Sequence, residues 1–221
     1  PSMNKKLSSL VAALALPAAL MAQGWPANHQ GVMLQGFYWN SFDASHWKNL
    51  ESQADELAQY FNLVWIPQSG NCGGESMGYD DLYWFNNYQS AFGSEQELRS
   101  MIGKLKQKGT GTIADVVINH RKTLTNWVDF PKATYQGKTY QLLSTDICKD
   151  DCGGQTASWA AANGYALSNN NDTGEGVTFA RDLDHNSANV QKNVKAYLHF
   201  LLNDMGYAGV RYDMVKGYAA K

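Results

Sequence analysis

The chain has 221 residues, of which 44% are hydrophobic and 17% are charged, so it can bury a substantial core and is not an intrinsically disordered segment. Its formal net charge is −2, and its lysines and arginines are scattered, which argues against a nucleic-acid partner. Seven Trp and twelve Tyr either fill the core or line a ligand-stacking cleft, and composition alone does not separate the two.

The first 22 residues are typical of an export signal. A short basic stretch at residues 3–6 precedes an apolar run at residues 7–20 that is too short to span a membrane. Cleavage after Ala22 would leave Gln23 first; the alternative is a buried N-terminal helix. Export predicts a secreted or periplasmic protein without a stable membrane span, and we expect it to be a monomer.

Three cysteines follow this segment. Cys148 and Cys152 lie close together in a polar stretch, and Cys72 is separate. Export permits a disulfide, so the pair forms either a local disulfide or free thiols. Without a second cysteine pair or a nearby histidine, the spacing is weak evidence for zinc.

The first part of the remaining chain alternates between apolar runs and amphipathic helices. Residues 31–37 predict a strand, and residues 45–60 predict a helix. Residues 63–66, closed by Pro67, predict a second strand. The inner face of the helix should carry four apolar residues at helical spacing: Trp47, Leu50, Ala54 and Leu57.

A capping box opens the next helix. Ser94 is followed three residues later by Glu97, and apolar residues then recur on one face until Lys108 and Gly109 end the helix. Residues 112–119 predict the third strand.

Helical and strand periodicity is absent from residues 121–178, where polar residues dominate. This stretch is longer than ordinary connections, so it predicts an inserted irregular subdomain. A helix capped by Asn186 or Ser187 follows and ends at Gly206. Residues 209–213 predict a fourth strand. The apolar stripe of this last helix comprises Val190, Val194, Leu198, Leu201 and Met205.

The expected fold class is therefore α/β, with strands and helices alternating around a parallel sheet. A complete (β/α)8 TIM barrel needs about 250 residues without insertions. The chain accounts for about its first four β/α units, with the insertion after the third strand.

Charged residues gather where the third and fourth strands end. Arg211 and Asp213 are two apart and face the same side, with Asp213 at the carboxyl rim. A neighbouring guanidinium keeps a carboxylate ionised, as a carboxylate nucleophile requires, although a salt bridge filling the barrel is an equal alternative. On the third strand, Asp115 and Asn119 share a face and His120 follows at the rim. Asp115 should meet Arg211 as structural support.

Two segments resemble conserved regions of the α-amylase family, glycoside hydrolase family 13. Residues 115–120 (DVVINH) are similar to its first region, and residues 209–217 (GVRYDMVKG) to its second. The resemblance extends to residues 31–39, 64–67 and 78–79 and is closest to plant-type and related bacterial α-amylases. It implies that the chain is the N-terminal part of such an enzyme and ends just after the nucleophile.

The resemblance implies catalytic and substrate-binding roles. Asp213 matches the nucleophile and Arg211 the residue that orients it. His120 matches the imidazole that binds the sugar at the cleavage subsite, Tyr79 the aromatic ring stacked on that sugar, and Lys216 a residue on the leaving-group side. The general acid of the family lies on a later strand, beyond this chain. Glu75 and Glu175 are acids in nearby loops, but neither matches a family motif.

A calcium site is also implied by the resemblance. Asn119 matches a calcium ligand, and Asp182 and Asp172 resemble ligands from the far end of the insertion. A backbone carbonyl near Gly217 would complete the oxygen shell, and hard oxygen ligands suit Ca²⁺. Two positions depart from the family pattern: Arg181 replaces a usual proline, and Gly217 stands where many microbial members have histidine.

Together these interpretations divide the chain into a signal peptide (1–22), a first part of the barrel (23–120), a calcium-binding inserted subdomain (121–184) and the continuing barrel (185–221). The implied activity is retaining endo-hydrolysis of α-1,4-glucosidic bonds in starch- or glycogen-type glucans by the parent enzyme, the chain alone being inactive. The alternatives are a transglycosylating or branch-cleaving relative and a non-catalytic glucan-binding or partner protein on the same barrel.

Overall fold

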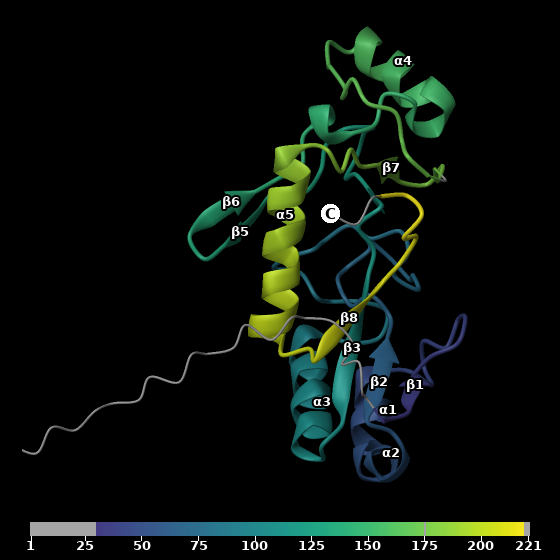
Figure 1. The fold of residues 1–221 in the computed structure, drawn as a ribbon, viewed down its shortest axis with the longest axis vertical. Coiled ribbons are helices and arrows are strands. Elements are labelled where there is room, and N and C mark those ends of the chain that lie inside the picture. The colour runs from purple at the N-terminus through teal and green to yellow at the C-terminus, as the bar shows by residue number, and fades with distance from the viewer. Residues whose placement is uncertain (1–29, 175, 219–221) are drawn as a thin grey trace, which may run out of the picture.

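The structure is a computed structural model that describes residues 30–174 and 176–218 (Figure 1). The segment interpreted as a signal peptide and Glu175 lie outside these described residues. Four parallel strands, in the order β1-β2-β3-β8, form the central sheet. They are β1 (Met33–Gln35), β2 (Leu63–Ile66), β3 (Gly111–Val116) and β8 (Gly209–Tyr212). This parallel order confirms the predicted fold class.

The helices that connect the strands cover one face of the sheet with apolar side chains. They are α1 (Trp47–Ser52), α2 (Ala54–Tyr60) and α3 (Glu95–Gln107). Ser94 caps α3 through the predicted capping box, with Glu97 bonding back to the Ser94 backbone. Trp47, Leu50, Ala54 and Leu57 are buried, as their spacing predicts. The single helix expected at 45–60 is broken at Gln53, whose backbone leaves helical geometry (φ −90°, ψ 0°).

The last helix leads directly into β8. It comprises α5 (Ala188–His199), capped by Ser187, and a π-helical continuation, η3 (Phe200–Met205), that ends at Gly206 in the left-handed region (φ 87°). The buried face of this helix differs from the predicted stripe. Val194 and Leu198 of the predicted stripe are only half-buried, while Ala196, Tyr197 and Phe200 are buried instead.

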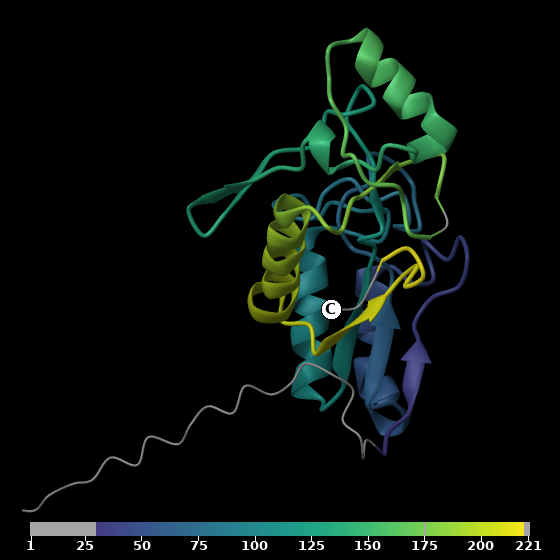
Figure 2. The same ribbon diagram turned by 45° about the horizontal axis from the view of Figure 1, so that its top comes forward.

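The insertion lies beyond the carboxyl ends of the strands, toward which the arrows of β1 and β2 point in Figure 2. It is less irregular than predicted. Its elements are β4 (His120–Arg121), the hairpin of β5 (Ala133–Tyr135) and β6 (Lys138–Tyr140), η1 (Ser144–Asp146), η2 (Asp151–Gly154), α4 (Gln155–Ala162) and β7 (Arg181–Asp182).

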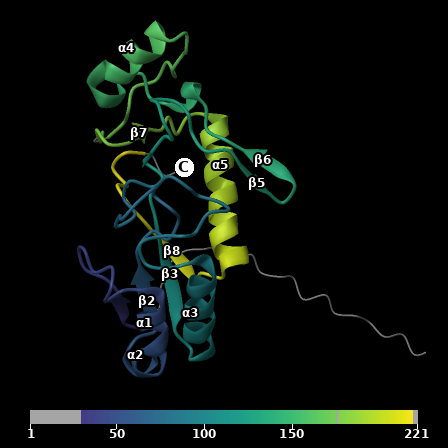
Figure 3. The same ribbon diagram turned by 180° about the vertical axis from the view of Figure 1, so that it is seen from behind.

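The hairpin β5–β6 packs beside α5 in Figures 1 and 3. The Tyr135 hydroxyl lies 2.8 Å from His199 Nδ1 and also hydrogen-bonds the Asp204 carboxylate. This contact fastens the hairpin to the helix that precedes β8.

The third strand is shorter than predicted, and this difference places Asn119 outside the sheet. The sheet ends at Val116, so Val117–Asn119 leave it, and His120–Arg121 pair antiparallel with Asp182–Arg181 across the insertion. Asn119 therefore lies at the junction of sheet and insertion rather than on the same strand face as Asp115. Both remain buried.

A continuous apolar core fills the space between the sheet, its helices and the insertion. Each large side chain buried there contributes roughly 1.5–3 kcal/mol to folding. The largest fully buried ones include Trp47, Trp84, Tyr88, Tyr197, Phe85, Phe92 and Phe130. Across the described part of the chain, no helix combines the length and apolar character needed to cross a membrane.

Candidate functional site

Two carboxylates share one guanidinium nitrogen at the end of β8. Arg211 Nη1 lies 2.7 Å from Asp213 Oδ1 and 2.8 Å from Asp115 Oδ1. The register of β3 and β8 places Asp115 opposite Arg211, and Asp213 comes directly after β8. The predicted meeting of Asp115 with Arg211 is therefore confirmed, and Arg211 and Asp213 point to the same side.

Burial and charge set the protonation of this cluster. Burial raises the pKa of Asp115, and the hydrogen bond and charge of Arg211 oppose that rise. The pKa of Arg211 is raised: burial lowers it, but its two carboxylate partners outweigh burial. The guanidinium carbon also lies 4.9 Å from the centre of the Trp65 ring. Arg211 therefore carries a permanent positive charge in a fixed position beside Asp213.

Tyr79 belongs to the loop between β2 and α3 and joins the same cluster. Its hydroxyl donates to Asp115 Oδ2 at 3.1 Å. Its ring stacks on Trp39 with centroids 6.1 Å apart and an interplanar angle of 7°. Trp39 is 68% exposed. Sequence reasoning did not single out Trp39, although it closes the motif at residues 31–39.

His120 is buried at the start of β4. Its Nε2–H donates to the Tyr79 carbonyl at 2.7 Å, and the exposed Phe179 ring meets the imidazole edge-on at 5.4 Å. Burial lowers the pKa of His120, partly offset by that hydrogen bond and by the charge of Asp213. A neutral imidazole therefore lies beside Tyr79. Lys216 is exposed in the turn after β8.

A cluster of oxygen atoms lies between the sheet and the insertion. Asn119 Nδ2 lies 3.5 Å from Asp182 Oδ1, while Asn119 Oδ1 and Asp172 Oδ2 are buried without a hydrogen-bond partner. A Cβ at Gly176 would lie 2.6 Å from Asp182 Oδ2 and 3.9 Å from Asp172 Oδ2. A Cβ at Gly217 would lie 1.6 Å from Asn119 Oδ1, so only glycine fits. The structure thus brings all four predicted residues together.

The charge of this cluster is unbalanced. Burial, and then the charges of Asp151 and Asp172, raise the pKa of Asp182 to about 8. Orphaned oxygens and mutually repelling carboxylates are what a bound cation would relieve. No three His, Cys, Asp or Glu side chains form a metal-binding group within residues 30–174 and 176–218. A cation here would therefore depend on amide and carbonyl oxygens beside Asp172 and Asp182.

Arg181, where the family pattern has proline, has a structural role in this chain. Its Nη1 lies 2.9 Å from Asp151 Oδ2, and both side chains are buried. The guanidinium also bonds Thr156 and covers the Trp127 ring at 4.6 Å. Asp151 in turn accepts the backbone N–H of Asp182 at 3.0 Å. Arg181 thus neutralises one carboxylate behind the oxygen cluster.

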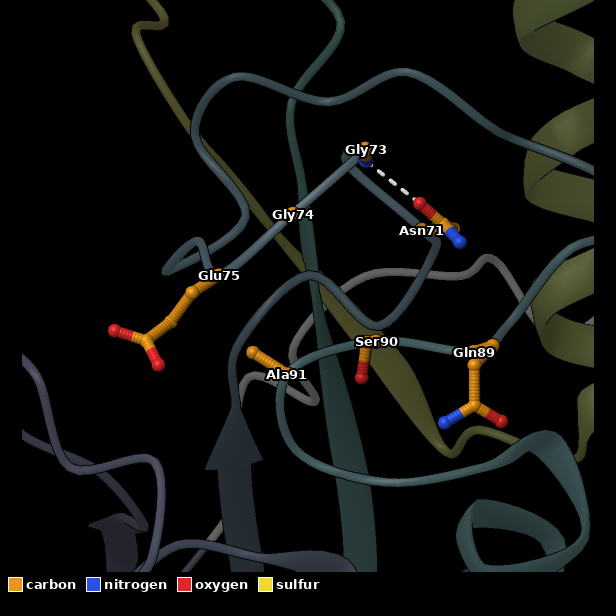
Figure 4. Close-up of a pocket in the computed structure, with 7 residues that line it drawn as sticks. All are labelled: Asn71, Gly73, Gly74, Glu75, Gln89, Ser90 and Ala91. Carbon is orange, nitrogen blue, oxygen red and sulfur yellow. Dashed lines mark hydrogen bonds between the residues drawn. The ribbon is translucent and has the colours of Figure 1, made fainter.

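An open hollow of about 420 Å³ lies elsewhere on the β2–α3 loop (Figure 4). It is lined by Asn71, by residues 73–75 and by residues 89–91, and Asn71 accepts the Gly73 backbone N–H. Among its described lining residues only Glu75 carries a carboxylate, and none belongs to the Arg211 cluster. Asp213 is not among the residues that line this hollow.

The three cysteines, Cys72, Cys148 and Cys152, are free thiols in the structure. Burial raises the pKa of each of them, to about 12 for Cys72. Of the two alternatives for Cys148 and Cys152, the structure has free thiols.

The comparisons with known proteins match these features. A family model described as the α-amylase catalytic domain matches residues 67–221. The chain is 30% identical over 191 residues to "Probable alpha-amylase 2" of Arabidopsis thaliana, covering 86% of this chain and 42% of that protein. It is 27% identical to a glucan 1,4-alpha-maltotetraohydrolase of Roseateles saccharophilus, covering 96% of this chain and 39% of that protein.

The solved structure of α-amylase I from Eisenia fetida has the same fold, with a TM-score of 0.56 at 19% identity. That match covers 85% of this chain and 38% of the other. The chain thus spans less than half the length of the relatives that it matches here, and its parallel sheet is a part of their barrel.

Proposed function

Because the chain belongs to the α-amylase family, we propose that its parent protein hydrolyses α-1,4-glucosidic bonds in starch- or glycogen-type glucans, internally and with retention of configuration. One observation carries the proposal. Asp213 follows β8 at the rim, and a guanidinium that is itself anchored to a buried aspartate holds it at 2.7 Å.

In this mechanism Asp213 attacks the anomeric carbon. The bond to the leaving oxygen breaks as a covalent glycosyl ester forms, and water then cleaves that ester, so two inversions give retention. Arg211 aims one carboxylate oxygen of Asp213 by holding the other. A retaining enzyme also needs a general acid about 5 Å from the nucleophile, to protonate the leaving oxygen. We assign that role to no residue of this chain.

Three further residues bind the sugar in this proposal. Tyr79 offers a ring face for stacking, and His120 a neutral imidazole. A sugar hydroxyl must compete with the Tyr79 carbonyl for the His120 Nε2–H. Lys216, exposed after β8, would contact the leaving-group side.

A calcium ion is the proposed cofactor. Asn119, Asp172 and Asp182 would hold it with side-chain oxygens, and Gly217 would contribute its backbone carbonyl. Two otherwise unpaired buried oxygens, on Asn119 and Asp172, support this assignment. When bound, the ion would supply positive charge that joins residues 121–184 to the barrel.

The remaining parts of the proposal concern the parent protein as a whole. We propose that it is exported, that residues 121–184 form its calcium-binding subdomain, and that it works as a monomer. A transglycosylating or branch-cleaving activity would use the same Asp213 with a different acceptor. A non-catalytic glucan-binding protein would not need the Asp213–Arg211 pair.

The test is Asp213→Asn in the parent protein, assayed on soluble starch. The amide cannot form the ester, so kcat should fall by about 10⁴-fold or more. Glu75→Gln is the matched control and should keep wild-type turnover. Anomer analysis by NMR should show an α product from the wild type. Unchanged turnover by Asp213→Asn, or a β product, would reject the mechanism.

A further inference from the structure

The backbone of Asp213 is held at both ends by contacts outside its own strand. Its N–H donates to the Val116 carbonyl at 2.9 Å. Its carbonyl accepts the Tyr218 hydroxyl, also at 2.9 Å. Tyr218 lies five residues further on, so the chain after β8 turns back toward the nucleophile.

Two features shape this turn. Met214 takes a left-handed conformation (φ 45°), and the Gly217 N–H bonds the Met214 carbonyl at 2.9 Å. Gly217 sits against Asn119 with no room for a side chain. The contact with Asn119 thus fixes the path of the turn, which brings the Tyr218 hydroxyl back to the Asp213 carbonyl.

The Tyr218 ring is itself fixed by His185, which directly follows the insertion. It stacks on the His185 imidazole with centroids 4.7 Å apart and an interplanar angle of 23°. The Nε2–H of His185 donates to the Ile118 carbonyl at 2.8 Å. The carbonyl of Asn119, the residue after Ile118, is also fixed, because it accepts the Leu183 N–H at 3.0 Å.

We infer that Tyr218 and His185 are positioning residues, which fix the Asp213 peptide so that its carboxylate stays aligned with Arg211. The inference rests on the proposed role of Asp213. Arg211 holds Asp213 through Oδ1, and Val116 accepts the Asp213 N–H, so the Asp213 carbonyl is the remaining polar group that needs a restraint. Tyr218 supplies that restraint, and His185 keeps the Tyr218 ring in place.

The primary variant is Tyr218→Phe in the parent protein. It removes the hydroxyl and keeps the ring stacked on His185. Misalignment of a reacting group costs rate rather than ground-state binding, so we expect kcat to fall by about 10-fold with KM within about 2-fold of wild type. The melting temperature should change by no more than that of Tyr60→Phe, which removes a hydroxyl from an exposed tyrosine at the end of α2.

A second variant, His185→Phe, keeps a ring for stacking and loses the bond to Ile118. It should lower kcat by a smaller factor, and the double variant should be no slower than Tyr218→Phe alone, because both act through one peptide. Multiplicative losses would overturn the role of His185.

Asp213→Asn separates this inference from the proposed function. Suppose that Asp213→Asn is inactive. If Tyr218→Phe then has wild-type kcat, or if its KM rises and its melting temperature falls in proportion to any loss of kcat, the positioning role is overturned while the proposed function stands. If Asp213→Asn remains active, the proposed mechanism fails and the inference fails with it. A selective loss of kcat in Tyr218→Phe together with an inactive Asp213→Asn supports both.

Discussion

Arg211 bonds two carboxylates through one nitrogen, and the two partners differ in environment. The Asp115 side chain is completely buried, whereas that of Asp213 is 15% exposed. Asp115 serves as the buried anchor, and Asp213 faces the site. In this row of Asp115, Arg211 and Asp213, the buried aspartate fixes the guanidinium, and the guanidinium fixes the outer carboxylate at the edge of the interior.

The first prediction concerns this row. Arg211→Met should destabilise the parent protein by about 3 kcal/mol, the low end for a broken buried pair, because Arg211 is 35% exposed. The cost arises because Asp115 is left buried and unpaired. Asp115→Asn in the same chain should recover part of the loss. Urea unfolding of the two single variants and the double variant measures this coupling, and strictly additive losses would show that the pair is not coupled.

At the scale of elements, caps and ion pairs fix where the helices begin. The Ser94 hydroxyl accepts the Glu97 N–H, and the Glu97 carboxylate accepts the Ser94 N–H at 2.8 Å. Lys48 of α1 also bonds Glu97 at 2.8 Å. One glutamate thus caps α3 and joins it to α1.

The second prediction is a dependence of stability on pH. The Lys48 hydrogen bond, followed by the Ser94 N–H, lowers the pKa of Glu97 from 4.5 to about 2. Because the folded pKa is depressed, the stabilisation is complete above pH 4.5 and is lost as pH falls toward 2. In Glu97→Gln the free energy of unfolding should no longer fall by this contribution between pH 4.5 and 2. In Glu56→Gln, on the exposed face of α2, it should still do so. Chemical unfolding across this pH range is the measurement.

The same cap allows a third prediction. Ser94→Ala should destabilise the fold by about 1 kcal/mol at neutral pH, because the Glu97 N–H at the start of α3 loses its acceptor. Ser94→Asp, which keeps an acceptor, should retain most of the stability. An equal loss of stability in the two variants would mean that the side-chain acceptor at position 94 contributes nothing.

At the scale of the whole molecule, the oxygen cluster joins the insertion to the sheet. Asn119 comes from the end of the β3 segment, Asp172 and Asp182 come from the insertion, and Gly217 follows β8. A cation held by all four would link segments that the chain connects only through long loops.

The fourth prediction is stabilisation by calcium. A ligand bound only by the folded state adds about 2.7 kcal/mol when its free concentration is 100 times Kd. Calcium should therefore raise the melting temperature of the parent protein, and a chelator should lower it. Asn119→Ala and Asp172→Ala should abolish the response, while Asp43→Asn, at an exposed position in the β1–α1 loop, should keep it. A wild-type melting temperature indifferent to the chelator would reject the site.

The fifth prediction compares residues 23–221 with the parent protein on soluble starch. The described sheet ends at β1 and β8, and large apolar residues near these edges are exposed, including Val32 (57%) and Val215 (61%). Such edges favour aggregation. In the proposed mechanism the general acid is no residue of 23–221, and the loss of general acid catalysis costs about 10² to 10⁴ in rate. Negligible turnover by residues 23–221 is expected; comparable turnover would make Glu75 and Glu175 the first residues to mutate in search of the acid.

Local patterns in the sequence determined the elements. The capping box at Ser94, the apolar spacing from Trp47 to Leu57 and the alternating strands predicted the parallel sheet and most of its helices, because cap hydrogen bonds and periodic burial depend on neighbours within a few residues. The alternation of side chains along the strands also predicted that Asp115 meets Arg211. The end of β3 was predicted three residues too late, since the buried apolar run continues past Val116.

Only the tertiary structure decided the contacts between distant segments. The pairing of Arg181 with Asp151, the stacking of Trp39 on Tyr79 and the hold of Tyr218 on the Asp213 carbonyl carry no local signature in the sequence. Tyr218 illustrates the reason. Its role depends on a turn that Gly217 allows by fitting against Asn119, nearly 100 residues earlier. It also depends on stacking with His185, which follows the insertion directly. Such geometry exists only after the sheet and the insertion have packed together.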